Sequence, residues 1–222
     1  MNHENLPVII VGTGGASKET YYLIKKINLF AKESFLIVGF MEKDSCRIGD
    51  VVFDDQIIIC SDETLGAFVL NYDRIGMVIP LSDPKSKQRI YQVSQSYQNI
   101  IYPNIVHPSV IIEGETQMGI GNIISAGSVL ACDLKIGDFN LINRCCTTGH
   151  DVIIGDFNTL NPSAVISGNV TIGSKCMIGA GAVVLQGLTV EDESVLGAGA
   201  VLANNASQGS TLVGIPAKRI EK

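Results

Sequence analysis

The sequence predicts two folds in one chain, a small parallel α/β sheet followed by an all-β parallel β-helix. Up to about residue 103, short apolar runs alternate with helix-like segments, which is typical of a parallel sheet with helices on its faces. Beyond residue 104 the charges thin out, the glycines multiply, and the sequence repeats every six residues. We therefore expect one domain over residues 1–104 and a second over residues 105–222.

The elements of the first domain follow from local patterns. The run Pro7 to Val11 is a buried strand, and the loop Gly12-Thr13-Gly14-Gly15 comes directly after it. Pro84 suits the first position of a helix. In order, we expect strands at 7–11, 35–40, 56–60, 75–79 and 100–102, and helices at 18–30, 64–70 and 84–97.

The second domain is predicted from the repeat. Every sixth residue from Val106 to Leu202 is aliphatic in sixteen of seventeen cases, with Thr148 the exception. Chance would supply about six, because about a third of this region is aliphatic. Glycine often follows the aliphatic residue, and a small residue often stands four places after it. We expect one inward side chain per short strand and a tight corner between strands, and stacking such strands buries a continuous aliphatic row.

Composition excludes several classes of protein. The net charge is −6 and no basic run occurs, so we expect no nucleic-acid partner. No stretch approaches 18 consecutive apolar residues, so we expect no membrane span. The first residues lack the pattern of a secretory signal, and the six cysteines lack metal-ligand spacing. We expect a cytoplasmic protein with reduced thiols and no metal.

His150 is the candidate catalytic residue. It lies two places after Thr148, the break in the aliphatic row, so strand alternation points it away from the core. Its neighbours Asn143, Thr147 and Asp151 are polar. A neutral imidazole, which titrates at about pH 6.5, can accept a proton from an amine or hydroxyl. An ordinary exposed histidine is the alternative.

The period of six, with its aliphatic, glycine and small positions, resembles the hexapeptide-repeat acyltransferases. The whole chain is similar to one branch, the bacterial sialic-acid O-acetyltransferases and nucleotide-4-amino-sugar N-acetyltransferases. This likeness is carried by four stretches, 8–15, 102–108, 143–151 and 213–219. The resemblance implies a Rossmann-like domain ahead of a left-handed β-helix, and a homotrimer. It also implies acetyl transfer from acetyl-CoA to an amine or hydroxyl of a bacterial sugar or sugar nucleotide.

The resemblance also implies the roles of residues in the second domain. His150 matches the general base, Asp151 the neighbouring acid, and Asn143 a residue that orients substrate or thioester. The backbone N–H of Gly168 is implied as the oxyanion donor. Coenzyme A is implied to run past Thr159, Gly168, Ala180 and Ala198. The structural alternatives are a solvated carboxylate for Asp151, an asparagine ladder for Asn143, and plain β-helix corners for the small residues.

In the first domain, the loop Gly12 to Gly15 after the first strand could bind a pyrophosphate through its backbone N–H groups. Ser17 stands where a dinucleotide fingerprint has its third glycine, which disfavours NAD. Three places depart from the family: Ala16 replaces a histidine, Met41-Glu42-Lys43 replaces an aspartate pair, and Leu81 lies in a segment that replaces an Ile-Gly pair. The implied substrate residues are Gly12, Thr13, Gly14, Gly15, Ala16, Glu42, Lys43 and Leu81.

These departures favour one alternative, a non-catalytic trimeric scaffold or a sugar-nucleotide sensor. The pair His150-Asp151 and the glycine-rich strip favour the enzyme. A hexapeptide zinc enzyme would need three clustered histidines, and only His107 and His150 lie in the repeat region.

Overall fold

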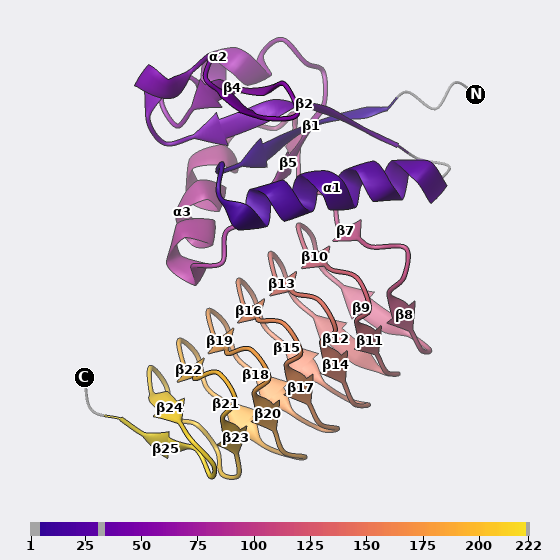
Figure 1. Ribbon diagram of the computed structural model, residues 1–222, viewed down its shortest axis with the longest axis vertical. Helices are drawn as coiled ribbons and strands as arrows, with labels where there is room; N and C mark the ends of the chain where they lie inside the picture. The colour runs from indigo at the N-terminus through magenta and orange to yellow at the C-terminus, as the bar shows by residue number, and fades with distance from the viewer. Residues whose placement is uncertain (1–4, 31–33, 221–222) are drawn as a thin grey trace. The chain divides into compact units, whose positions relative to one another are not determined.

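The computed structural model describes residues 5–30 and 34–220 (Figure 1). The chain separates into two compact units: residues up to Ser82 together with 86–108, and residues 83–85 together with 109–222. Among the described residues, no helix combines the length and apolar character needed to cross a membrane.

The first unit is built on a six-stranded sheet in the order β3-β4-β2-β1-β5-β6. All neighbouring strands are parallel except β3, which is antiparallel to β4. The strands are β1 (Leu6–Val11), β2 (Phe35–Glu42), β3 (Val51–Phe53), β4 (Gln56–Ser61), β5 (Ile75–Val78) and β6 (Ile100–Ile101), with β7 (Ile105–Val106) after them. The helices are α1 (Gly15–Phe30), η1 (Ser45–Arg47), α2 (Leu65–Val69) and α3 (Pro84–Ser94).

Strand β1 lies between β2 and β5, so the chain reverses its direction of winding at the carboxyl end of β1. Open α/β sheets bind ligands at this switch point. The four residues Val8 to Val11 are all buried, which explains why the strand reads as an unbroken apolar run.

The expected elements are present with shifted ends, and β3 and η1 are additions. Helix α1 begins at Gly15, three residues before the expected start, and α3 ends at Ser94. The hairpin from β3 to β4 turns through Asp54 and Asp55, with φ of 49° and 59°. Two aspartates in the left-handed region are uncommon, so the sequence gives a weak signal for this turn.

The second unit is a left-handed parallel β-helix of short strands that form three sheets (Figure 1). One sheet contains β10, β13, β16, β19, β22, β24 and β25; the second contains β8, β11, β14, β17, β20 and β23; the third contains β9, β12, β15, β18 and β21. The strands are β8 (Ile111–Ile112), β9 (Thr116–Met118), β10 (Ile123–Ile124), β11 (Val129–Leu130), β12 (Leu134–Ile136), β13 (Leu141–Ile142), β14 (Thr147–Thr148), β15 (Ile153–Ile154), β16 (Thr159–Leu160), β17 (Val165–Ile166), β18 (Thr171–Ile172), β19 (Met177–Ile178), β20 (Val183–Val184), β21 (Thr189–Val190), β22 (Val195–Leu196), β23 (Val201–Leu202), β24 (Thr211–Val213) and β25 (Lys218–Arg219).

The register of the coils is constant. In the second sheet Val129 pairs with Thr147, Thr147 with Val165, and Val165 with Val183, so each step is 18 residues. The predicted aliphatic row is buried at every member from Ile124 to Leu202. Ile112, on the first strand of its sheet, is 42% exposed because no further strand of that sheet covers it.

The corners differ from the expectation. The left-handed residue falls three places after the inward residue, with φ between 55° and 73° from Gly121 to Gly199. Residues as large as Phe139 and Phe157 occupy it, and their rings stack at 5.2 Å. The glycine that directly follows each inward aliphatic residue has a different role, because it lets neighbouring coils pack closely. A Cβ on Gly137, for example, would lie 2.8 Å from the backbone of the next coil.

Candidate functional site

His150 lies at the corner between β14 and β15, and its side chain is 53% exposed. The imidazole Nδ1 lies 2.7 Å from Oδ2 of Asp151. Asp151 holds the left-handed corner position, with φ of 56°, which directs its carboxylate back to the ring. A neutral imidazole then donates from Nδ1 and keeps a lone pair on Nε2. The corner thus presents a proton acceptor of fixed orientation.

Gly168 lies one coil further along the β-helix, against the ring of His150. A Cβ built on Gly168 would lie 2.7 Å from Nε2 and 3.0 Å from Cδ2 and Cε1. The ring therefore lies over a position that must lack a side chain. Within residues 5–30 and 34–220, no hydrogen bond uses the Gly168 N–H, so this donor is free for a ligand. A proton acceptor and an unused backbone N–H therefore lie at one corner.

Thr148, the one polar residue in the inward aliphatic row, lies two residues before His150. Thr148 is 5% exposed and points into the core. Among the described residues its Oγ1 has no hydrogen-bond partner. A buried hydroxyl without a partner costs stability, so this threonine is a local exception to the packing of the core.

Asn143 lies at the preceding corner of the same coil, between β13 and β14. Its Nδ2 donates to the carbonyl of Leu160 at 3.1 Å, and Asn161 donates in the same way to Ile178 at 3.0 Å. The asparagine ladder is therefore present. Ala180 and Ala198 are exposed at the same corner of the β-helix, two and three coils beyond Asn143.

Within one chain, the predicted catalytic and cofactor residues thus divide between two corners. His150, Asp151 and Gly168 share one, and Asn143, Ala180 and Ala198 share the other. Thr159, on β16, is 0% exposed in this structure, as is its neighbour Leu160. The Thr159 contact with the cofactor stays a prediction.

The sheet of β8 to β23 separates the two corners. Its outward side chains are exposed or half-buried, and all are β-branched: Ile111, Val129, Thr147, Val165, Val183 and Val201. Val165 is 38% exposed. An apolar strip of this kind is typical of a surface that contacts another protein.

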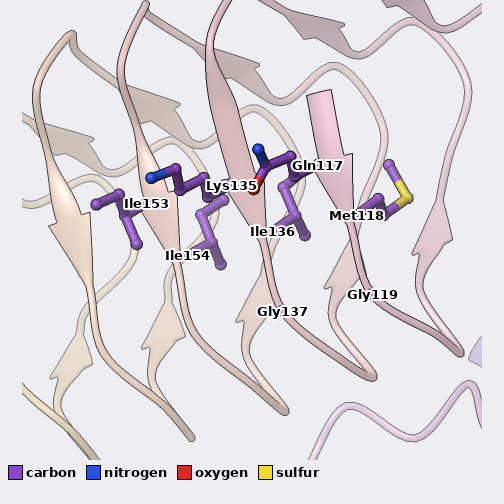
Figure 2. Close-up of a pocket in the computed structure, with 8 residues that line it drawn as sticks. All are labelled: Gln117, Met118, Gly119, Lys135, Ile136, Gly137, Ile153 and Ile154. Atoms are coloured by element: carbon purple, nitrogen blue, oxygen red, sulfur yellow. The ribbon is translucent and has the colours of Figure 1, made fainter. Parts of the chain in front are cut away.

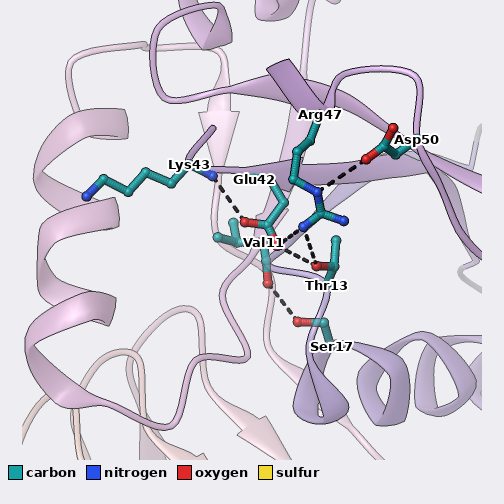
Figure 3. Close-up of polar contacts among 7 residues, drawn as sticks. All are labelled: Val11, Thr13, Ser17, Glu42, Lys43, Arg47 and Asp50. Atoms are coloured by element: carbon teal, nitrogen blue, oxygen red, sulfur yellow. Dashed lines mark hydrogen bonds and ion pairs between the residues drawn. The ribbon is translucent and has the colours of Figure 1, made fainter. Parts of the chain in front are cut away.

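Thr13 and Glu42, two of the predicted substrate residues of the first unit, lie together at the carboxyl end of β1 (Figure 3). Gly12 has φ of 80°, its N–H donates to Met41 O at 2.7 Å, and a Cβ there would lie 3.1 Å from Leu81. Thr13 Oγ1 donates to Glu42 Oε1 at 2.5 Å. The structure therefore brings the loop after β1, the end of β2 and the segment after β5 together.

Other residues of this loop differ in their accessibility. A Cβ on Gly14 or Gly15 would meet nothing within 4 Å, so the backbone there is open. Ser17, at the third-glycine position, is buried and donates to the carbonyl of Val11 at 2.9 Å, which ties α1 to β1. Ala16 is half-buried, and the side chain of Lys43 extends away from the cluster (Figure 3).

Arg47 completes this cluster and is a residue that no sequence pattern predicted. Its Nη1 lies 3.7 Å from Glu42 Oε1 and 3.5 Å from Thr13 Oγ1, and its Nε lies 3.3 Å from Asp50 Oδ2. Arg47 is a lone arginine at the end of η1, in a segment of mixed charge, so its spacing matches no motif.

A groove of about 430 Å³ lies elsewhere, on the sheet of β9, β12 and β15 (Figure 2). Gln117, Lys135 and Ile153 extend from successive strands along it. None of the predicted site residues lines it, and it lacks the convergent polar groups of a typical ligand site. In the described part of the chain, no group of three or more His, Cys, Asp or Glu side chains could hold a metal ion.

Comparison with known proteins identifies the repeat and the fold. A family model described as the hexapeptide repeat of succinyl-transferase matches residues 169–203. No curated protein sequence matches the chain. A mutant of perosamine N-acetyltransferase from Caulobacter crescentus, solved with CoA and GDP-perosamine, is similar with a TM-score of 0.87 and 22% identity over 97% of both chains.

Two further structures are similar over nearly their whole length. The acetyltransferase domain of PglB from Neisseria gonorrhoeae, solved with acetyl coenzyme A, gives a TM-score of 0.84 at 23% identity, covering 98% of this chain and 100% of that one. WeeI from Acinetobacter baumannii gives 0.83 at 23% identity, covering 97% and 100%. These likenesses establish the fold of both units, as the sequence predicts.

Proposed function

We propose that this protein transfers an acetyl group from acetyl-CoA to an amine or hydroxyl of a nucleotide-linked sugar, with His150 as the general base. The observation that carries the proposal is the corner at which Asp151 orients the His150 ring above Gly168. The similar structures add support, because one holds CoA with GDP-perosamine and another holds acetyl coenzyme A.

The geometry supports direct transfer. Nε2 of His150 accepts the proton of the sugar amine or hydroxyl as its nitrogen or oxygen bonds to the thioester carbon. The carbonyl oxygen gains the negative charge, and the free Gly168 N–H donates to it. The C–S bond then breaks, and the protonated imidazole returns its proton to the coenzyme A thiolate. No covalent enzyme intermediate is needed.

We infer that the working unit is a homotrimer whose sites lie between copies. One chain presents the proton acceptor at one corner and Asn143, Ala180 and Ala198 at another. A neighbouring copy that packs on the β-branched sheet would bring its second corner beside the first corner of this chain. The β-branched strip from Ile111 to Val201, which is exposed or half-buried, supports this packing.

We further propose that the first unit binds the sugar nucleotide at the end of β1. Gly12, Thr13, Glu42 and Leu81 lie together there. Gly14 precedes α1 and Gly15 and Ala16 begin it, and the backbone at Gly14 and Gly15 is open to a phosphate. The backbone N–H of Lys43 donates to Glu42 Oε2 at 3.2 Å and so helps to position the Glu42 carboxylate. A cytoplasmic location fits the use of acetyl-CoA and the six free thiols.

Thiol release tests the proposal. The protein would be incubated with acetyl-CoA and a panel of nucleotide amino sugars, free amino sugars and sialic acid. We expect release with at least one nucleotide sugar, and release slower by about 10²–10⁴-fold with His150→Ala at the same protein concentration. Tight sugar-nucleotide binding without any thiol release would instead identify the sensor that the sequence leaves as the alternative.

A further inference from the structure

Arg47 connects the two loops that follow β1 and β2. Its guanidinium contacts Thr13 on the first loop, Glu42 at the end of β2 and Asp50 beyond η1 (Figure 3). Because β1 and β2 are parallel neighbours, these loops meet at the edge where open α/β sheets bind ligands. The position of Arg47 is therefore part of the proposed substrate site.

The backbone that carries Arg47 is fixed. Asp44 Oδ1 accepts the N–H of Cys46 at 3.0 Å, which caps η1 and lowers the pKa of the Asp44 carboxyl. The N–H of Asp50 donates to Arg47 O at 3.0 Å, and the carbonyl of Asp50 accepts from Ile58 on β4 at 3.0 Å. The guanidinium is thus held in place before any ligand arrives.

Arg47 and Glu42 both have hydrogen-bonding capacity that their contacts within the protein do not use. A guanidinium has five N–H donors, and the contacts of Arg47 employ Nε and Nη1. No contact within the described residues employs Nη2, and the side chain is 43% exposed. Glu42 accepts from Thr13 and from the Lys43 N–H, which leaves lone pairs on a carboxylate that can accept about four hydrogen bonds. A free donor on Arg47 and free acceptor positions on Glu42 therefore lie next to each other.

The charges decide which part of a sugar nucleotide fits here. Two carboxylates, Glu42 at 3.7 Å and Asp50 at 3.3 Å, flank one guanidinium, so the three side chains carry a net negative charge. A phosphate would be repelled by this group, whereas a neutral group with both donors and acceptors would not. The open backbone at Gly14 and Gly15 remains for the phosphates.

We propose that Arg47 and Glu42 bind the nucleoside of the sugar nucleotide and determine which nucleotide is accepted. Arg47 donates from Nη2 to a nucleoside acceptor, and Glu42 accepts from a nucleoside hydroxyl or N–H. This inference rests on the proposed function in taking a sugar nucleotide as the substrate. Arg47 is assigned here as a specificity-determining residue that acts in binding, remote from the acetyl transfer at His150.

Calorimetric titration of the full chain with GDP, UDP and inorganic pyrophosphate tests the assignment. We expect Arg47→Ala to weaken the tighter of the two nucleotides by about 10- to 100-fold, as for hydrogen bonds to a charged group, and to leave pyrophosphate affinity within about twofold. Arg47→Lys keeps the charge without the planar fork and should restore little. Lys25→Ala, which removes an exposed cation 3.3 Å from Asp54, is the matched control and should change nothing.

Three results would overturn the inference. They are unchanged nucleotide binding in Arg47→Ala, an equal loss of pyrophosphate affinity, which would make Arg47 a phosphate ligand, and no nucleotide binding by the wild-type chain. Thermal unfolding checks that each variant is folded, which we expect because exposed ion pairs contribute little to stability.

Steady-state kinetics separate this inference from the proposed function. We expect Arg47→Ala to raise the KM for the sugar nucleotide while kcat and the KM for acetyl-CoA stay unchanged. Acetyl transfer with an unchanged nucleotide KM would overturn the role of Arg47 and leave the proposed function intact. Nucleotide binding through Arg47 without thiol release would do the reverse.

Discussion

Substitution of Gly168 by alanine tests the geometry of the proposed active site without removing any proposed catalytic group. The added methyl would lie 2.7 Å from Nε2 of His150 and 3.0 Å from two ring carbons. Ordinary contacts between non-bonded carbons are about 3.5–4.0 Å, so the ring must move by roughly 1 Å. The backbone N–H is retained in alanine, and the φ of Gly168 is outside the left-handed region, so the peptide itself need not change.

We expect kcat to fall about 100-fold, because a displacement of 1 Å in a catalytic group costs roughly that much. Stability should change by less than about 1 kcal/mol, since the ring is exposed and can rotate away. The assay is thiol release at saturating substrates, with acetyl-CoA affinity measured separately by calorimetry.

The double variant His150→Ala with Gly168→Ala provides the control. If the methyl acts by displacing the ring, it should cause no further loss once the imidazole is absent. A further loss, together with weaker acetyl-CoA binding, would mean that the methyl blocks the thioester instead. A folded Gly168→Ala protein with normal kcat would refute the assignment of this corner as the catalytic site.

Three further outcomes are expected. His150→Ala should lower kcat by about 10²–10⁴-fold in thiol release, with unchanged circular dichroism, because an outward side chain leaves no cavity; near-normal turnover would place the base elsewhere. Thr148→Val should raise the free energy of unfolding in denaturant titrations by about 1–3 kcal/mol, because it removes a buried hydroxyl without a partner; a loss of stability would mean that the hydroxyl is satisfied. Burial raises the pKa of Cys146 and Cys176 to about 11 and that of Cys60 to about 12, so the folded state keeps these thiols protonated where the unfolded state ionises. Their contribution to stability is present below about pH 9 and is lost as pH rises through 11 to 12, and replacing all three by alanine should flatten the stability profile there.

The β-helix could be predicted from the sequence in detail, because its strands are two or three residues long and one periodic row sets their phase. Once the inward residues are known, Thr148 and Leu130 share a face and His150 must point outward. The corner of His150 and Gly168 follows from the same count, since 18 residues bring the chain back to the same corner. The left-handed positions could not be predicted, because residues as different as Phe157 and Lys175 adopt them under the constraint of the coil.

The features that escaped prediction depend on contacts between distant segments. Thr159 alternates like an outward residue, yet both residues of β16 are buried. Arg47 reaches Thr13 across 34 residues of sequence, and only the parallel pairing of β1 and β2 brings their loops together.

The constant step of 18 residues has a consequence for how this protein can change. Each coil adds about 4.8 Å along the axis, and every inner strand of a sheet pairs with the coil before it and the coil after it. A one-residue insertion within a strand would turn the following inward side chains outward, whereas the addition of a whole coil would only lengthen the prism. His150 and Gly168 stand one coil apart, so any change of length between them would part the imidazole from the glycine beneath it. The segment of the proposed active site is therefore the part of the β-helix where insertions and deletions are least tolerated.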